Sequence, residues 1–226
     1  MKLQMNLTSC LIAAATLFGG ISTANASGPT LGSAARFALL STATSHRGAV
    51  TCTDSTVVGD VGSSGYVPAV VKTRCLISGS IVAPVTAQVL SDTARARVQL
   101  STTTCKTLLA GTQAGAILPP GNYCFPAAAA LTGTITLNGP STGVWIFKVN
   151  GDLTGNSVSV VMANGGSPCN VFWAPTGATT MTTSNLKGNV LAGQAITITG
   201  GSFNGRAFAG KGVTVTNTAV TGCGLR

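Results

Sequence analysis

The C-terminal third of the chain repeats one pattern of apolar and polar positions. Residues 178–194, 195–211 and 212–222 align without a gap at one constant period. Apolar residues and threonines alternate at the start of each segment, which is typical of a strand with one buried and one exposed side. Two columns of threonine result: Thr180, Thr197 and Thr214 in the first, and Thr182, Thr199 and Thr216 in the second.

Each repeat divides into three short strand-like runs. The first repeat contains "TTMTT", "NLKG" and "NVLAG", and the second contains "ITITG", "SFNG" and "RAFAG". Three short strands per turn predict a triangular β-solenoid, in which each coil buries its core only by stacking on the next. We expect a corner at the glycine column of positions 188, 205 and 222. We expect the apolar columns to point inward: Met181, Ile198 and Val215 in one, and Leu186, Phe203 and Val220 in the other.

The alternating pattern extends upstream at a longer, again constant spacing, which leads from Thr180 to Ser157 and then to Thr134. The local sequences agree, with "TIT" at 134–136 and "SVS" at 157–159. The sequence therefore predicts five coils that share one exposed face of small hydroxyl residues without charge. Its predicted members are Thr134, Thr136, Ser157, Ser159, Thr180, Thr182, Thr197, Thr199, Thr214 and Thr216.

This hydroxyl face has two interpretations. Threonine is a good strand residue, so the columns are compatible with an ordinary solvated surface. Exposed sheet positions normally include charged residues, however, and a flat uncharged sheet invites edge pairing. The absence of any charge from five coils of a basic protein therefore favours a binding function for this face.

The third strand of each coil is apolar on both sides, as in "NVFWA" at 170–174 and "RAFAG" at 206–210. One side fills the solenoid and the other needs a cover, for which the helical pattern of about residues 84–110 is the candidate. We place Val85, Val89, Ala94, Val98 and Leu100 on the apolar side of that helix, and Arg95 and Arg97 on its solvent side. We expect Phe172 and Trp173 to be core residues rather than ligand-stacking residues.

The N-terminus has the pattern of a secretory signal peptide. Lys2 precedes an apolar run from Leu11 to Phe18, and Ala24-Asn25-Ala26 follows as a cleavage site. The run is too short to span a bilayer; a retained signal anchor is the alternative. We therefore expect residues 1–26 to be removed and residues 27–226 to form a single secreted domain without membrane insertion.

Six cysteines remain after this processing, an even number that suggests three disulfides in an oxidising compartment. Cys52 and Cys75 flank a compact segment and are predicted to pair. Cys169 and Cys223 lie about three coils apart, roughly 14 Å at the strand spacing, so we do not expect them to pair. The remaining choice is Cys124 with Cys169, which leaves Cys105 with Cys223.

The composition excludes several kinds of chemistry. The chain has 13 Lys and Arg residues against four acidic residues, and no Glu. Glycoside hydrolysis needs two facing carboxylates, and Asp54, Asp60, Asp92 and Asp152 are widely separated. With His46 as the single histidine, in a polar and solvated stretch, we expect no enzyme, no metal site and no cofactor. The positive charge is compatible with a polyanion partner, but the basic residues form no run and we expect no nucleic-acid binding.

The chain resembles the ice-binding protein family built on a discontinuous right-handed β-solenoid. The resemblance covers essentially the whole mature chain, from about residue 30 to 223. It is carried by the segments "LGSAARFALLS" (31–41), "STVVGDVGSS" (55–64), "LPPGNYCF" (118–125), "LTGTITLNG" (131–139), "GVWIFKV" (143–149), "CNVFW" (169–173) and "GNVLAGQAITITGGSFNGRAFAGKGVTV" (188–215).

This resemblance implies a triangular right-handed solenoid, one long α-helix packed along one face, and N-terminal coils stacked out of sequence. It also implies adsorption to ice, with thermal hysteresis or inhibition of ice recrystallisation, by a monomer whose partner is the ice crystal surface. Ice-contacting faces of the family often carry a Thr-Ala/Gly-x-Thr/Asn pattern, which "TAVT" at 218–221 matches. This leaves open which face of the solenoid binds. An extracellular adhesion module on the same fold is the alternative function.

Overall fold

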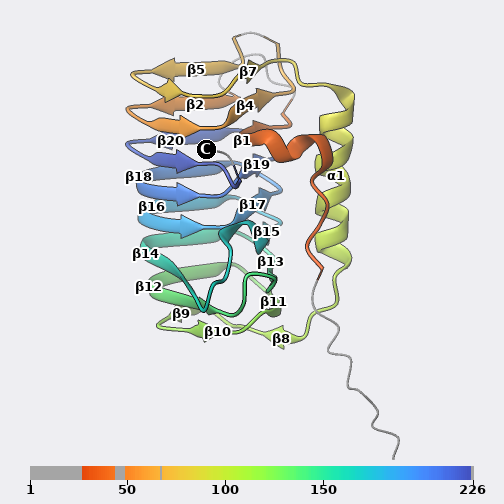
Figure 1. Ribbon diagram of the computed structural model, residues 1–226, viewed down its shortest axis with the longest axis vertical. Helices are drawn as coiled ribbons and strands as arrows, with labels where there is room; N and C mark the ends of the chain where they lie inside the picture. Colours follow the sequence, from red (N-terminus) through yellow and green to blue (C-terminus); the bar gives the residue numbers. More distant parts are fainter. Residues whose placement is uncertain (1–26, 44–48, 67, 225–226) are drawn as a thin grey trace, which may run out of the picture.

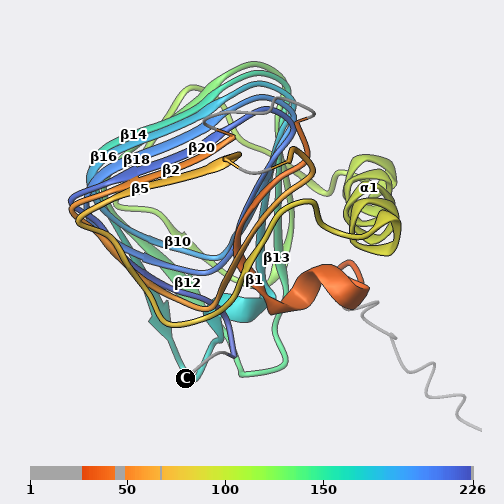
Figure 2. The same cartoon turned by 90° about the horizontal axis from the view of Figure 1, so that it is seen from above.

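The computed structural model describes residues 27–43, 49–66 and 68–224, which form a stack of triangular coils (Figure 1). Seen along the stack, the coils have three flat sides, and the helix α1 (Ala87–Thr102) lies outside one of them (Figure 2). The predicted β-solenoid with one covering helix is therefore confirmed. The predicted signal peptide and His46 lie outside the described residues.

The first side of the triangle is a parallel sheet of nine strands, the side that α1 covers. In spatial order its strands are β7 (Ile81–Val82), β4 (Asp60–Ser63), β1 (Phe37–Ser41), β19 (Ala207–Ala209), β17 (Asn189–Ala192), β15 (Val171–Pro175), β13 (Trp145–Val149), β11 (Gly121–Phe125) and β8 (Thr107–Leu108).

The second and third sides are joined by long strands that turn a corner and contribute to both. These are β12 (Ala129–Asn138), β14 (Leu153–Ala163), β16 (Thr179–Lys187) and β18 (Ile196–Asn204). Shorter strands complete the second side: β9 (Thr112–Ala114), β20 (Val213–Thr216), β2 (Val50–Thr53) and β5 (Val70–Thr73). Others complete the third side: β10 (Ile117–Leu118), β21 (Ala219–Thr221), β3 (Thr56–Val58) and β6 (Leu76–Ile77).

The corner between these two sides is a column of residues with left-handed backbone. Gly133 has φ 61°, and Ser157, Thr183 and Asn217 have φ between 49° and 53°. L-residues rarely adopt this conformation, but it turns a strand sharply without ending its pairing. The corner therefore lets one strand serve two sides of the triangle.

The N-terminal strands lie on top of the C-terminal coil, as the family resemblance implied. Leu39 pairs with Ala207, Thr51 with Thr214, and Val57 with Val220, all in parallel register. The helix α1 then carries the chain back along the stack to β8 at its opposite end (Figure 1). The early coils thereby bury the apolar edge that the C-terminal coil would otherwise expose.

The interior contains the predicted apolar columns. Leu186, Phe203 and Val220 are each 1% exposed, and Met181, Ile198 and Val215 are equally buried. Phe147 stacks between Tyr123 and Trp173 with ring centroids 5.2 and 4.0 Å apart, so three consecutive coils share one aromatic stack. At the glycine corner, a Cβ on Gly205 would lie 1.9 Å from the carbonyl oxygen of Gly188, so the coils can approach this closely only with glycine there.

The helix is shorter than predicted and is rotated about its axis. It ends at Thr102, and Thr107–Leu108, which were predicted to be helical, form β8 instead. Val89, Ala96 and Leu100 are buried against the first side, whereas Ala94 and Val98, predicted on the apolar side, are exposed, Val98 by 59%. Arg97 was predicted on the solvent side, and this is wrong. It lies next to the buried Ala96, and its side chain reaches over the sheet to donate to the carbonyls of Ala192 and Phe208. No helix within the described ranges is long and apolar enough to cross a membrane.

Three disulfides connect the coils, and one of the predicted pairs is confirmed. Cys52 is bonded to Cys75, with Cα atoms 5.8 Å apart. The predicted pairs Cys124–Cys169 and Cys105–Cys223 are wrong, because Cys105 is bonded to Cys124 and Cys169 to Cys223.

The error for Cys169 and Cys223 has a physical cause. The estimate of three coils assumed that Cys223 continues the third-strand column of Asn189 and Arg206. In the structure, the strand that stacks on β19 is β1, as the pairing of Leu39 with Ala207 shows. Cys223 is therefore not in that column. Cys169 lies in the short helix η2 (Pro168–Asn170), and its carbonyl accepts a hydrogen bond from Asn189 of the next coil. The two Cα atoms consequently lie 5.3 Å apart.

Candidate functional site

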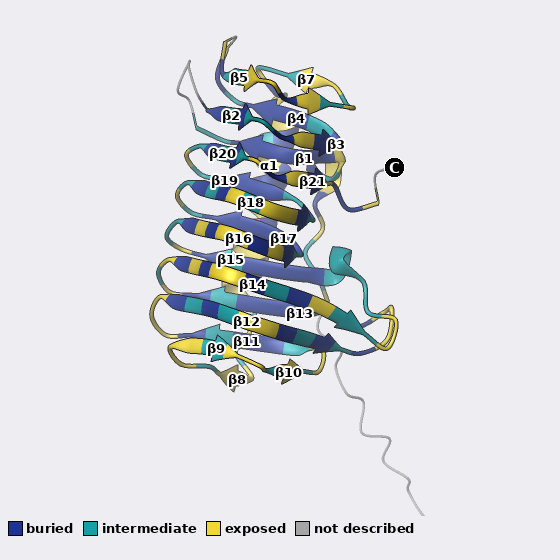
Figure 3. Ribbon diagram, turned by 90° about the vertical axis from the view of Figure 1, so that its left-hand side faces the viewer, coloured by how far each residue is buried: buried dark blue, intermediate teal, exposed yellow. Residues whose placement is uncertain are grey.

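The second side of the triangle presents two columns of small uncharged side chains, which we call the threonine face. Its exposed and half-buried positions alternate with buried ones along β14, β16 and β18, as the colour bands in Figure 3 show. The first column contains Ala130, Thr154, Thr180, Thr197, Thr214 and Thr51. The second contains Thr132, Asn156, Thr182, Thr199, Thr216 and Thr53.

Six of the ten predicted hydroxyl residues lie in these columns. Thr180, Thr197 and Thr214 are consecutive partners in the first column, and Thr182, Thr199 and Thr216 are consecutive in the second. The structure adds Thr51 and Thr53, which sequence reasoning missed because β2 joins the stack out of order. The run "VTCT" at 50–53 carries the same Thr-x-Thr signal and would have identified them.

The other four predicted residues do not belong to the threonine face. Ser157 occupies the left-handed corner with φ 53°. Thr134 pairs with Ser159 on the third side, and Thr136 pairs there with Val161. The prediction is wrong here because it assumed that the upstream coils keep one constant spacing.

The actual spacing is larger because the loop around residues 163–170 lengthens the coil. The partner of Thr180 in the preceding coil is Thr154, not Ser157. Ser157 lies three positions beyond Thr154, which places it at the corner rather than on the second side. A register error by an odd number of residues also exchanges the buried and exposed sides of a strand.

The corner beside the threonine face is held by a ladder of buried hydroxyls. Ser184 Oγ donates to the carbonyl of Thr182 and accepts from the amide of Val158 one coil away. Thr218 Oγ1 likewise donates to the carbonyl of Thr216 at 2.8 Å. These bonds fix the strand ends on which the second column is mounted. Because threonine is also restricted at χ1, the face is stiff at both backbone and side-chain level.

The threonine face forms a regular array. Neighbouring strands lie about 4.7–4.9 Å apart, and residues two apart along a strand lie about 6.6–6.8 Å apart. None of its twelve residues carries a charge. The ion pair of Arg74 with Asp54 lies beyond Thr53 at the corner of the last coils, where hydrogen bonding to Arg74 lowers the pKa of the Asp54 carboxyl. The array can therefore order water by shape and hydrogen bonding without a competing charge.

The third side lacks this regularity. Pairing between β14 and β16 ends at Ser159 and Asn185, so the strands separate beyond this point. Its outward positions include Lys187 and Val161 as well as small polar residues. The first side is covered by α1. Of the three sides, the second alone combines continuous pairing, exposure and absence of charge over the described residues.

Both the sequence and the fold of this chain match known proteins. The family model described as Ice-binding-like matches residues 18–221. The chain belongs to this family. A curated ice-binding protein of Flavobacterium frigoris is 32% identical over 188 residues, covering 74% of the chain, and the match spans 66% of that relative. Another, from Nostoc sp., is 32% identical over 203 residues, covering 86% of the chain and 74% of the relative.

Solved structures show the same fold. The crystal structure of the ice-binding protein from Antarctomyces psychrotrophicus superimposes with a TM-score of 0.78 at 28% identity, covering 86% of this chain and 98% of that one. The ice-binding protein of an Antarctic Flavobacteriaceae bacterium gives a TM-score of 0.77 at 36% identity, covering 86% of this chain, although the match spans only 47% of that longer one. The solenoid with its covering helix is thus the fold of the ice-binding-like family.

Proposed function

We propose that this chain is a secreted ice-binding protein that adsorbs to ice through the threonine face and thereby inhibits ice growth and recrystallisation. The observation that carries the proposal is the strand register, which stacks the two columns over six consecutive coils without a charged residue. Relatives that cover most of the chain are named ice-binding proteins, which supports the same activity.

The mechanism follows from the competition between ice and liquid water. Liquid water offers hydrogen bonds as good as those of ice, so strong hydrogen bonding alone gives no preference for the crystal. A stiff array orders water before binding, which reduces the entropic cost of joining the lattice. The threonine methyl groups restrain that water and the hydroxyls anchor it, whereas a charged side chain would hold its own hydration shell.

The carboxylates of the molecule have structural partners. Asp60 pairs with Arg36, Asp54 with Arg74, and Asp92 accepts hydrogen bonds from the amide and hydroxyl of Ser33. Asp152 accepts a hydrogen bond from the amide of Ala178. This use of the carboxylates supports a binding protein rather than an enzyme. The three disulfides support an oxidising, extracellular location, to which the signal peptide would direct a monomer that neither inserts into membranes nor binds nucleic acid.

The test compares two substitutions on one strand. Thr199 and Ser202 are both exposed residues of β18, but they lie on the threonine face and the third side, respectively. Thr199→Tyr places a bulky ring on the array and should abolish thermal hysteresis and recrystallisation inhibition, while Ser202→Tyr should retain both. Circular dichroism checks that both variants are folded. If Thr199→Tyr retains the wild-type activity, the threonine face is not the binding surface.

A further inference from the structure

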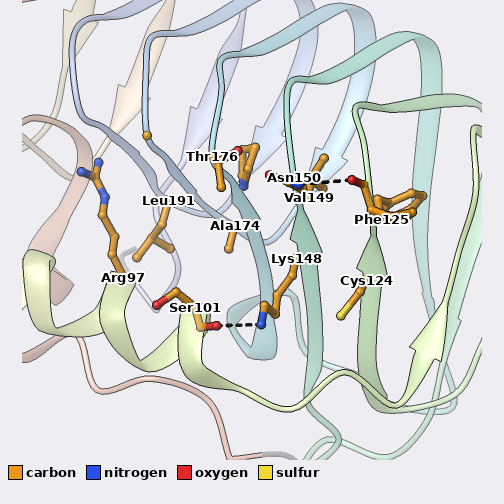
Figure 4. A pocket seen from close by; sticks show the side chains of 13 residues that line it. Arg97, Ser101, Cys124, Phe125, Lys148, Val149, Asn150, Ala174, Thr176 and Leu191 are labelled. Carbon is orange, nitrogen blue, oxygen red and sulfur yellow. Dashed lines mark hydrogen bonds between the residues drawn. The ribbon is translucent and has the colours of Figure 1, made fainter.

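A cavity of about 610 Å³ lies between the helix α1 and the lower part of the first side. Its walls come from the last turns of the helix and from β11, β13, β15 and β17, as Figure 4 shows. Leu191, which belongs to the apolar cluster under the helix, forms the floor with the half-buried Ala174. Phe125 and Val149 also line the cavity, but their side chains belong to the solenoid interior. The volume lies within the range of small-molecule sites, about 300–1,000 Å³.

Two cations face this apolar cavity from its sides. In Figure 4, Leu191 and Ala174 lie between Arg97 and Lys148. The Lys148 ammonium donates to the carbonyls of Ser101 and Thr103 at 2.7 and 2.8 Å, which uses two of its three protons. None of the described residues that line the cavity is an Asp or Glu. The cavity therefore has positive charge without a compensating carboxylate.

Arg97 is the less satisfied of the two cations. Its Nη2 donates to the carbonyls of Ala192 and Phe208, at 2.8 and 3.3 Å. Its Nε is buried and has no hydrogen-bond acceptor among the described residues. Burial lowers the pKa of this guanidinium, because the charged form loses hydration. A buried donor without an acceptor is costly, so an anion that reaches Nε would be stabilised there.

We propose that this cavity binds a carboxylate with an apolar tail, such as a medium-chain fatty acid. Nε is covered in this structure, so a change in the Arg97 rotamer would bring its Nε–H to the carboxylate, while the tail covers Leu191 and Ala174. Lys148 adds positive potential at the other side. The threonine face lies on a different side of the triangle (Figure 2), so the ligand would leave it uncovered and the proposal is independent of ice binding.

Octanoate and octan-1-ol form a matched pair of probes, because they share the tail and differ in the charged head. Isothermal titration calorimetry of the oxidised protein should show saturable octanoate binding. Its Kd should be at least about tenfold lower than that of octan-1-ol, a difference of about 1.4 kcal/mol in binding free energy. Arg97→Met should weaken octanoate binding by a similar factor. Lys187→Met removes a cation from the third side instead and should leave binding unchanged.

A second variant keeps the test independent of Arg97's packing role. Ala174→Phe fills the cavity but retains both cations, and should abolish octanoate binding in a protein with an unchanged circular dichroism spectrum. Saturable octanoate binding that is weakened about tenfold in Arg97→Met, lost in Ala174→Phe and unchanged in Lys187→Met supports the site. Equal binding of octan-1-ol, unchanged binding in Ala174→Phe, or no saturable binding at all overturns it.

Discussion

Asn189 joins three segments of the solenoid through one fully buried side chain. Its Nδ2 donates to the carbonyls of Cys169 and Val171 at 2.9 and 3.1 Å. Its Oδ1 accepts from Nη1 of Arg206 at 3.1 Å. The substitution Asn189→Ala removes all three bonds at once and leaves two carbonyls and a guanidinium proton without this partner.

The structure sets the magnitude of the effect. Each orphaned buried polar group costs about 1–3 kcal/mol. Cys169 and Arg206 are only half-buried, so water can replace part of the lost hydrogen bonding. The total cost therefore lies in the lower part of the range obtained by adding the three groups. We expect a loss of about 3–5 kcal/mol in the free energy of unfolding, which for a chain of this size lowers Tm by about 6–20 °C.

Urea unfolding of the oxidised protein, followed by circular dichroism, measures this loss. The matched control is Asn185→Ala on the exposed third side, where the side chain forms one hydrogen bond with Ser202 and the expected change is within about 0.5 kcal/mol. A loss below about 1 kcal/mol for Asn189→Ala, or equal losses for the two variants, would refute the reasoning that this buried bridge stabilises the coils.

Three further predictions concern the register, the carboxylates and the disulfides. Thr154→Lys should abolish thermal hysteresis and Ser159→Lys should not; the opposite result would restore the columns predicted from sequence. Hydrogen bonds from the hydroxyl and amide of Ser33 lower the pKa of Asp92. This stabilisation is present above the unfolded pKa of about 3.9 and is lost as the pH falls through the folded pKa. The urea midpoint should therefore fall more steeply on acidification in wild type than in Asp92→Asn, and parallel curves would contradict this. Peptide mapping should recover Cys169 linked to Cys223, and replacing both by serine should cost about 2–5 kcal/mol; a Cys124–Cys169 peptide would contradict the structure.

The fold was predictable from sequence where the coils have a constant length. From Thr179 onward the period has no insertion, so strand alternation alone placed Met181, Phe203 and the six threonines correctly. It was not predictable where loops vary in length, because the side on which a residue falls depends on the number of residues in each coil. Ser157 and Ser159 were misplaced for this reason.

Long-range stacking was the other limit of sequence reasoning. Because β1 stacks on β19, Cys223 cannot continue the column of third strands. No local sequence pattern predicts this contact between distant parts of the chain. The helix posed a similar difficulty. Its apolar residues are few, so its rotation is determined by packing, which buries Val89 and Ala96 and turns Arg97 toward the sheet. The cavity beside Arg97 could therefore be found only in three dimensions.

The most direct test of the central claim is partition of the protein into growing ice. A dilute solution of the oxidised wild-type protein and Thr199→Tyr, each carrying a different fluorophore, is frozen slowly on a cold finger. Ice normally excludes solutes, so only a protein that adsorbs to the crystal is incorporated. We expect the wild type to be enriched in the ice fraction and Thr199→Tyr to remain in the liquid. Exclusion of both proteins would contradict ice binding and favour an adhesion module on the same fold, whereas incorporation of both would place the binding surface outside the threonine face.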